Sequence, residues 1–166
     1  PEIVKVAGQV HLFQRSANWV LPKLDRPFTE AQLEAFRADP MPMLRFRAEV
    51  EANMNQGMTF SDPQVNAERE AAGLAAIEVV QDPEVRAALR PTHPFGCKRP
   101  LFSNVYYPAF NEPNLELVTD PIARVTANAV VTADGVERTV DTVILATGFT
   151  TTRYVSAIEV VGRHGR

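Results

Sequence analysis

Cysteine is nearly absent from this sequence, since Cys97 is the single one among 166 residues. An internal disulfide and a cysteine-rich zinc site are therefore both excluded. The three histidines, His11, His93 and His164, stand too far apart in the sequence to suggest a metal cluster. A reducing, cytoplasmic setting is the expectation for such a chain, and Cys97 itself is expected to be a small buried apolar residue.

The sequence has no excess of positive charge and no long apolar runs. Lys and Arg number 17 against 20 Asp and Glu, so the chain has no basic field of the kind that binds nucleic acid. Any anion must then be bound by a few local side chains. No stretch approaches the roughly 18 apolar residues that a membrane-spanning helix needs. We therefore expect no nucleic-acid partner and no membrane span, while the 45% apolar content is sufficient for the core of one domain.

The first half of the chain combines one strand with a helical block. Residues 9–15 carry an apolar run of strand length with a polar end. From 26 to 90 the pattern is helical, and Thr29 begins a capping box. Asp62 and Asp82 each precede a proline, which is the arrangement of a capping residue before the first helical position. We expect one helix that ends at Pro40 and others at 44–55, 64–80 and 83–90.

From Leu115 onward the chain returns to a strand pattern, with apolar segments at 115–118, 122–126 and 129–140. The pair Asp134-Gly135 predicts a hairpin turn in which both central residues take positive φ. The last run, 142–146, is continuously apolar, which is typical of a strand buried on both faces of a mostly parallel sheet. The pattern as a whole predicts an α/β fold with a helical insertion and a β-hairpin or meander.

The end of the first predicted strand is a candidate nucleotide site. In a dinucleotide-binding βαβ unit this strand ends at the adenosine ribose, with an acidic residue for NAD or an arginine for NADP. Arg15 and Ser16 stand there, and a guanidinium with a hydroxyl can bind the NADP 2′-phosphate. A solvated arginine is the alternative. Gly8 stands alone where a G-x-G-x-x-G loop would precede the strand, so either the fold differs or the first strand lies upstream.

Two adjacent cations, Lys98 and Arg99, form the second candidate. A solvated pair on a loop is the simplest interpretation, but their apolar neighbours predict a half-buried loop: Phe95, Leu101 and Phe102. Thr147 and Gly148 form a third candidate, because they end the strand predicted at 142–146, where backbone can approach a cofactor. A glycine that only serves its turn is the alternative there.

Three segments carry a resemblance to a known family. They are FQRSANWVLP at 13–22, PFGCKRPLFSNVYYPAFNEPNLELV at 94–118 and DTVILATGF at 141–149. These resemble consecutive blocks of the flavin-dependent Baeyer–Villiger monooxygenases, including the cyclohexanone, phenylacetone and hydroxyacetophenone types. The resemblance covers essentially the whole chain, is weakest in the helical block, and departs from the family at Val105, where an aspartate is expected.

The resemblance implies a domain organisation. Residues 1–25 and 91–150 would form a Rossmann-like NADPH-binding domain with a parallel sheet, and 26–90 would be a helical insertion. Residues 151–166 would begin the return to an FAD domain. The chain would thus be a truncated fragment of a flavoprotein with two dinucleotide-binding domains, inactive by itself because it depends on the remainder of its own chain.

The resemblance also implies roles for the candidate residues. Lys98, Arg15 and Ser16 would surround the NADPH 2′-phosphate, and Thr147 and Gly148 would lie near a cofactor. Arg99 would reach the FAD, where a fixed positive charge favours an anionic oxygen nucleophile and stabilises its adduct with a ketone.

The reaction implied by the resemblance inserts one oxygen atom from O₂ next to a ketone carbonyl, giving an ester or lactone. The alternatives are a flavin monooxygenase that oxidises nitrogen or sulfur, and a non-catalytic NADPH-binding module.

Overall fold

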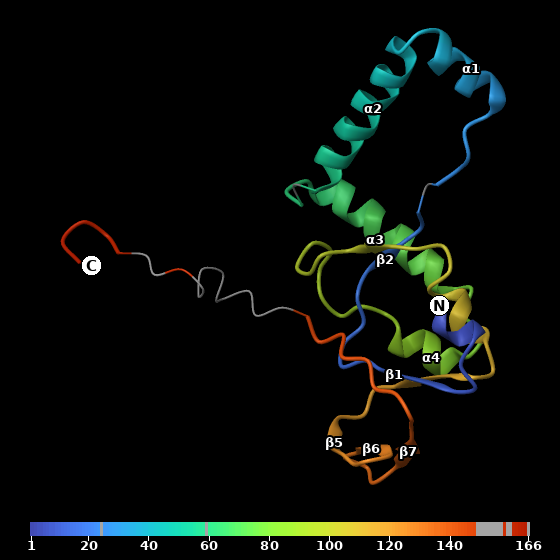
Figure 1. Cartoon of the computed structure of the whole chain (residues 1–166), viewed down its shortest axis with the longest axis vertical. Coiled ribbons are helices and arrows are strands. Elements are labelled where there is room, and N and C mark those ends of the chain that lie inside the picture. The colour runs from blue at the N-terminus through green and yellow to red at the C-terminus, as the bar shows by residue number, and fades with distance from the viewer. Residues whose placement is uncertain (24, 59, 149–157, 159–160, 166) are drawn as a thin grey trace. The chain divides into compact units, whose positions relative to one another are not determined.

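A computed structural model describes residues 1–23, 25–58, 60–148, 158 and 161–165. It divides into two compact units, Pro1–Pro121 and Ile122–Arg166 (Figure 1). The segment 151–166, predicted to lead back to an FAD domain, lies mostly outside the described residues. No described helix is long and apolar enough to cross a membrane.

The first unit is built on two small parallel pairings. Strand β1 (Val10–Phe13) pairs in parallel with β4 (Leu115–Val118), so the segments predicted at the two ends of this unit lie side by side. Strand β2 (Val20–Leu21) pairs in parallel with β3 (Leu101–Phe102). Parallel neighbours require long crossover connections, and here the helices supply them. The predicted α/β class with parallel pairing is confirmed.

The helical block follows the capping signals. The helices of this unit are η1 (Ile3–Lys5), α1 (Glu30–Ala38), α2 (Met41–Met58), α3 (Pro63–Ile77), α4 (Pro83–Ala88) and η2 (Pro108–Asn111). Thr29 forms the predicted capping box, and Asp62 and Asp82 accept bonds from the first-turn amides. Helix α2 begins three residues earlier than expected, because Asp39 Oδ1 accepts from Met41 N–H at 2.9 Å and prolines are tolerated in a first turn.

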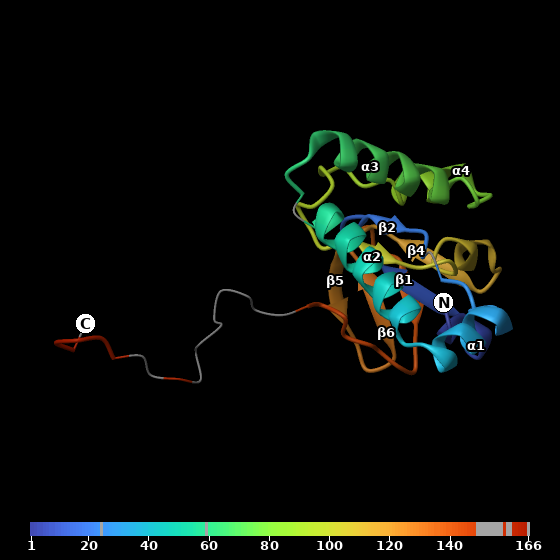
Figure 2. The same cartoon turned by 90° about the horizontal axis from the view of Figure 1, so that it is seen from above.

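The core of this unit lies between α3, β2 and the segment around η2. Val20, Ile77, Val80, Leu89, Tyr107 and Phe110 form one buried cluster, and Trp19, Leu21 and Phe95 form another. Helix α3 packs against β2, and Figure 2 shows α3 and α4 together on one side of the parallel strands. Strand β2 is thus covered by α3, which places the residues just before β2 beside that helix.

The second unit contains an antiparallel meander. Strands β5 (Ile122–Val125), β6 (Ala129–Thr132) and β7 (Glu137–Thr139) pair in the order β5-β6-β7. The predicted hairpin at Asp134-Gly135 is confirmed, but its predicted geometry is wrong. Only Gly135 takes positive φ, at 89°, and its N–H donates to Thr132 O at 3.0 Å. Such a three-residue loop ends in one left-handed residue, so Asp134 needs no positive φ.

The strand predicted at 142–146 is not formed. These residues carry no strand pairing among the described residues, and Val143, Ile144 and Leu145 are 50%, 66% and 81% exposed. A parallel strand exists only where neighbours satisfy its N–H and C=O groups. The apolar composition of this segment predicted burial, but no described strand provides the neighbour.

Candidate functional site

The structure joins the first two candidate segments. Strand β1 ends at Phe13, and Gln14 N–H extends its pairing by donating to Val118 O at 2.9 Å. Ser16 follows two residues later, at the carboxyl end of a parallel strand, where open α/β sheets bind their ligands. Lys98 Nζ donates to Ser16 Oγ at 2.7 Å across a sequence separation of 82 residues. Tertiary folding therefore brings the predicted phosphate-binding serine and lysine into direct contact.

Three cations around this contact lack an acidic partner. Among the described residues, Arg15, Lys98 and Arg99 form no ion pair, and all three side chains are exposed. Elsewhere in the same unit some basic side chains are paired, as Lys5 is with Glu2 at 2.8 Å and Arg90 is with Glu78 at 2.8 Å, while others, such as Arg45 and Arg47, also form no ion pair among the described residues. Uncompensated guanidinium and ammonium groups beside a hydroxyl are suited to bind a phosphate.

A tight turn at 94–97 directly precedes Lys98 and positions it near Ser16. Cys97 N–H donates to Pro94 O at 3.3 Å, and Gly96, the third residue of the turn, has φ of 88°. This is the pattern of a type II turn, which requires a glycine at its third position. A Cβ at Gly96 would lie 2.6 Å from Phe60 Cγ, so both the backbone conformation and the packing demand glycine here.

The chain is held again just after the cations. Leu101 N–H donates to Trp19 O and Ser103 N–H donates to Leu21 O, each at 2.9 Å. These bonds belong to the β2–β3 pairing, which follows Ser16 on one strand and Arg99 on the other. The segment after Ser16 and the segment after Lys98 are therefore held in one register.

Two tyrosines follow the cation loop. Tyr106 Oη donates to Gln14 Oε1 at 3.2 Å, which links this segment to the end of β1. Burial raises the pKa of Tyr106, and burial with the neighbouring Tyr106 raises the pKa of Tyr107 to about 12. Gln14 Nε2 is buried without a hydrogen-bond partner in the described part of the chain, and Tyr107 Oη is buried near the backbone of Val20. Both tyrosines therefore stay protonated at neutral pH. Tyr107 belongs to the buried core cluster, and Tyr106 packs against that cluster.

Two expectations about the cation loop are wrong. Cys97 is exposed, because the turn directs it away from the core while Phe95, at 6% exposed, points inward. Leu101 and Phe102 are 49% and 56% exposed. The loop is therefore not half-buried, and of its three apolar neighbours only Phe95 packs into the core. Trp19 is 4% exposed and packs edge-on against Phe95.

Thr147 and Gly148 belong to the second unit. Both are exposed, and Gly148 has φ of 87°, a conformation that favours glycine. Their proximity to a cofactor stays a prediction.

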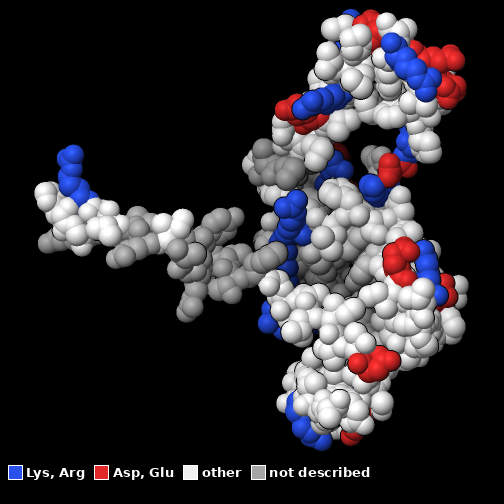
Figure 3. Space-filling view, in the orientation of Figure 1, with Lys and Arg blue, Asp and Glu red and all other residues white. Residues whose placement is uncertain are grey.

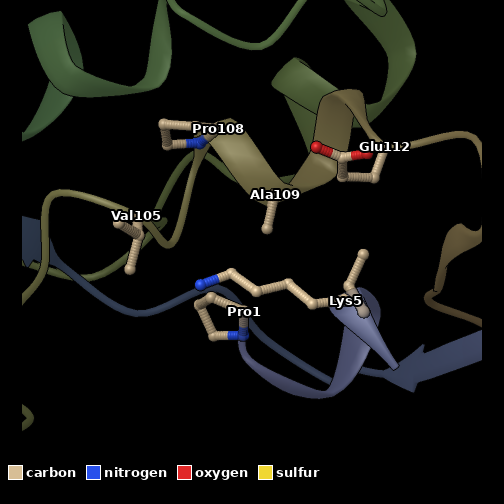
Figure 4. A pocket seen from close by; sticks show the side chains of 7 residues that line it. Pro1, Lys5, Val105, Pro108, Ala109 and Glu112 are labelled. Carbon is tan, nitrogen blue, oxygen red and sulfur yellow. The ribbon is translucent and has the colours of Figure 1, made fainter. Parts of the chain in front are cut away.

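Other surfaces of the described chain offer less chemistry. No group of three or more His, Cys, Asp or Glu able to hold a metal occurs among the described residues. On the face drawn in Figure 3, basic and acidic side chains alternate in small groups. A pocket of about 220 Å³ lies between the N-terminal segment and η2, lined by Lys5, Val105 and Ala109 among others (Figure 4). None of the predicted site residues lines this pocket.

Two residues near the site could not be predicted from the sequence to support it. Asn18 Nδ2 donates to Arg99 O at 3.0 Å, and Glu70 Oε1 accepts from Phe95 N–H at 2.8 Å. A glutamate on a helix is usually solvated, and an asparagine before a strand is usually part of a turn. Only the arrangement of α3 beside β2 reveals that both side chains hold the cation loop.

The chain is similar to curated monooxygenases over its full length. It is 36% identical over 170 residues to a Baeyer–Villiger monooxygenase of Pseudomonas aeruginosa, covering 100% of this chain and 32% of that protein. It is 32% identical to a Baeyer–Villiger monooxygenase of Streptomyces coelicolor, covering 33% of that protein. A phenazine N-monooxygenase of Lysobacter antibioticus is 40% identical over 116 residues, which cover 64% of this chain and 21% of that protein. No protein-family model matches the chain.

Solved structures show the same relationship. A steroid monooxygenase bound to NADP superposes with a TM-score of 0.78 at 29% identity, covering 100% of this chain and 39% of the other. An open cyclohexanone monooxygenase gives a TM-score of 0.76 at 26% identity, covering 99% of this chain and 40% of the other. The chain thus spans about a third of the length of the curated relatives it matches. It is a homologue of the Baeyer–Villiger monooxygenases and corresponds to one part of them.

Proposed function

We propose that this chain is the NADPH-binding part of an FAD- and NADPH-dependent Baeyer–Villiger monooxygenase. The observation that carries the proposal is the hydrogen bond between Lys98 and Ser16 at the carboxyl end of β1. It creates a cationic, hydroxyl-bearing site where dinucleotide-binding sheets hold the adenosine ribose. The predicted domain boundaries, with NADPH binding by 1–25 and 91–150 and an insertion at 26–90, are part of this proposal.

The residues present fit the 2′-phosphate of NADPH. Lys98 donates one N–H to Ser16 and retains two further donors. Arg15 adjoins Ser16, has no ion-pair partner among the described residues, and can bind a phosphate with two parallel hydrogen bonds. NADH lacks this phosphate, so these three side chains would favour NADPH.

Arg99 would take part in the oxygenation reaction and would not bind the nucleotide phosphate. Its guanidinium has no hydrogen-bond or ion-pair partner among the described residues, while its backbone carbonyl is held by Asn18. FAD, when bound, supplies the oxygen activation. Arg99 would keep the attacking oxygen anionic and stabilise the negative charge that develops when it adds to a ketone. An arginine suits this role because it stays protonated at any working pH.

The partners of the complete protein follow from this assignment. They would be NADPH, FAD, O₂ and a small ketone, with the FAD domain supplied by the remainder of a longer chain. The single cysteine is consistent with a cytoplasmic setting.

A nitrogen-oxidising enzyme is the second candidate, favoured by the similarity to a phenazine N-monooxygenase. Nitrogen and sulfur are oxidised by a protonated, electrophilic oxygen, so an anion-stabilising Arg99 favours ketone oxidation. A non-catalytic NADPH-binding module is the third candidate.

The test uses the full-length flavoprotein of which we propose this chain to be a part. Purified enzyme with FAD, NADPH and O₂ should convert a panel of ketones into esters or lactones. The Arg99→Ala variant should lose this product by a factor of at least about 100, which corresponds to one electrostatic donor of the reacting oxygen, while its NADPH affinity stays near that of the wild type.

The outcomes separate the three candidates. Oxidation of amines or sulfides without any ester would support the second. NADPH binding without consumption of O₂ would support the third. Ester formation by Arg99→Ala at the wild-type rate would refute the role of Arg99.

A further inference from the structure

The loop with the two cations is held at three points, each by a residue outside the loop. Trp19 Nε1 donates to His93 O at 2.9 Å, Glu70 Oε1 accepts from Phe95 N–H at 2.8 Å, and Asn18 Nδ2 donates to Arg99 O at 3.0 Å. The bonds at His93 and Phe95 precede Lys98 in the chain, and the bond at Arg99 follows it. The exposed Lys98 therefore stands on a segment that is fixed on both sides.

The bond from Glu70 completes the turn at 94–97. The hydrogen bond within the turn uses Cys97 N–H and leaves Phe95 N–H without a partner in the turn. That N–H is partly buried, because Phe95 packs against Trp19 and Phe60 at ring-centroid distances of 6.1 Å and 5.8 Å. A buried N–H needs an acceptor. Glu70, on α3, provides it with a carboxylate, which is a stronger acceptor than a neutral group.

Helix α3 is fixed relative to β2 by close packing. A Cβ at Gly73 would lie 2.8 Å from Trp19 Cε3, so the helix approaches Trp19 as closely as a glycine allows. Glu70 lies one helical turn before Gly73 and hence on the same side of α3. Trp19 follows Ser16 by three residues. Helix α3, the segment from Ser16 to Trp19 and the cation loop thus form one packed assembly.

We propose that Glu70 is a positioning residue for the NADPH site, through which the predicted helical insertion sets the place of Lys98 relative to Ser16. This inference rests on the proposed function, since it assigns the 2′-phosphate to Lys98 and Ser16. Glu70 itself does not touch the nucleotide. Its acceptor holds Phe95 and the turn, and the turn holds Lys98 within hydrogen-bonding distance of Ser16.

The test compares three variants of the full-length protein by calorimetric affinity for NADPH and NADH. Glu70→Ala removes the acceptor and should reduce the preference for NADPH over NADH about 5- to 10-fold. This is a part of the effect of losing the charged hydrogen bond from Lys98 to the phosphate, because Lys98 would be displaced but still present. Glu70→Gln keeps an acceptor oxygen and should retain most of the preference. Glu68→Ala is the matched control, because Glu68 lies exposed on the same helix and accepts a hydrogen bond only from Gln64 among the described residues.

The preference ratio separates positioning from mere stabilisation. If Glu70 only stabilised the fold, Glu70→Ala would lower the melting temperature while the ratio of the two affinities stayed that of the wild type. That result would overturn the inference, and so would a ratio in Glu70→Gln as low as in Glu70→Ala. A wild-type protein that binds NADPH no better than NADH would instead refute the proposed phosphate site.

Discussion

Removal of the Lys98 ammonium tests the proposed nucleotide site most directly. In the structure Lys98 Nζ lies 2.7 Å from Ser16 Oγ, and neither Lys98 nor Arg15 is neutralised by an acidic side chain among the described residues. A phosphate that bridges these groups would gain the ammonium as a charged hydrogen-bond donor. Lys98→Ala would leave Ser16 and Arg15 in place and remove that donor alone.

The magnitude depends on how strongly water screens the pair. Two unit charges about 4 Å apart interact by about 1 kcal/mol in bulk water and by about 4 kcal/mol at the effective dielectric of a protein surface. Lys98 is exposed, so its contribution should lie toward the lower figure, at about 1–3 kcal/mol, in line with hydrogen bonds to charged groups. Because each 1.4 kcal/mol is a factor of ten, NADPH affinity should fall about 5- to 150-fold.

The assay measures the affinities of the full-length protein for NADPH and NADH at two salt concentrations. Affinity for NADPH should fall in Lys98→Ala and become less sensitive to salt, because one screened charge contact is lost. Affinity for NADH should change by less than about twofold, since NADH has no 2′-phosphate. Lys5→Ala is the matched control, because Lys5 is an exposed lysine already paired with Glu2. An equal loss for both nucleotides would refute the assignment of Lys98 to the 2′-phosphate.

Two further predictions concern the supports of the site. Gly96→Ala should destabilise the protein by about 1–2 kcal/mol, because φ of 88° is strained for any residue with a Cβ and that Cβ would lie 2.6 Å from Phe60 Cγ. Denaturant unfolding measures this loss of stability, and an unchanged midpoint of the unfolding transition would contradict the turn geometry. Tyr107→Phe should reduce the loss of stability at alkaline pH. Burial raises the Tyr107 pKa to about 12 in the folded chain, above its unfolded value of about 10, so its stabilising contribution is complete below pH 10 and is lost as the pH rises toward 12. Equal alkaline unfolding profiles for variant and wild type would refute this.

Much of the local structure follows from short sequence signals. The capping box at Thr29 and the aspartate-proline pairs before α3 and α4 begin helices where they were predicted, because capping depends on only a few neighbouring residues. The hairpin at Asp134-Gly135 also forms, but with a single left-handed residue. The length of the loop between paired strands sets that geometry, and a dipeptide signal does not specify the length.

Burial was harder to predict than secondary structure. The apolar run at 142–146 predicts an inner strand, yet Leu145 is 81% exposed, because a strand needs neighbours that its own composition cannot provide. Cys97, which was expected to be buried, is exposed, because the turn at Gly96 directs Phe95 and Cys97 to different sides.

By itself, the sequence determined the candidate residues Arg15, Ser16, Lys98 and Arg99 and the resemblance to a family, because residue type and local order are enough to carry both. Only the tertiary structure decided that Lys98 meets Ser16 at 2.7 Å and that Glu70 supports the turn that precedes Lys98. These contacts join residues 82 and 25 positions apart. They form because β1 pairs with β4 and α3 packs against β2, and such pairings depend on the packing of the whole unit rather than on any short segment.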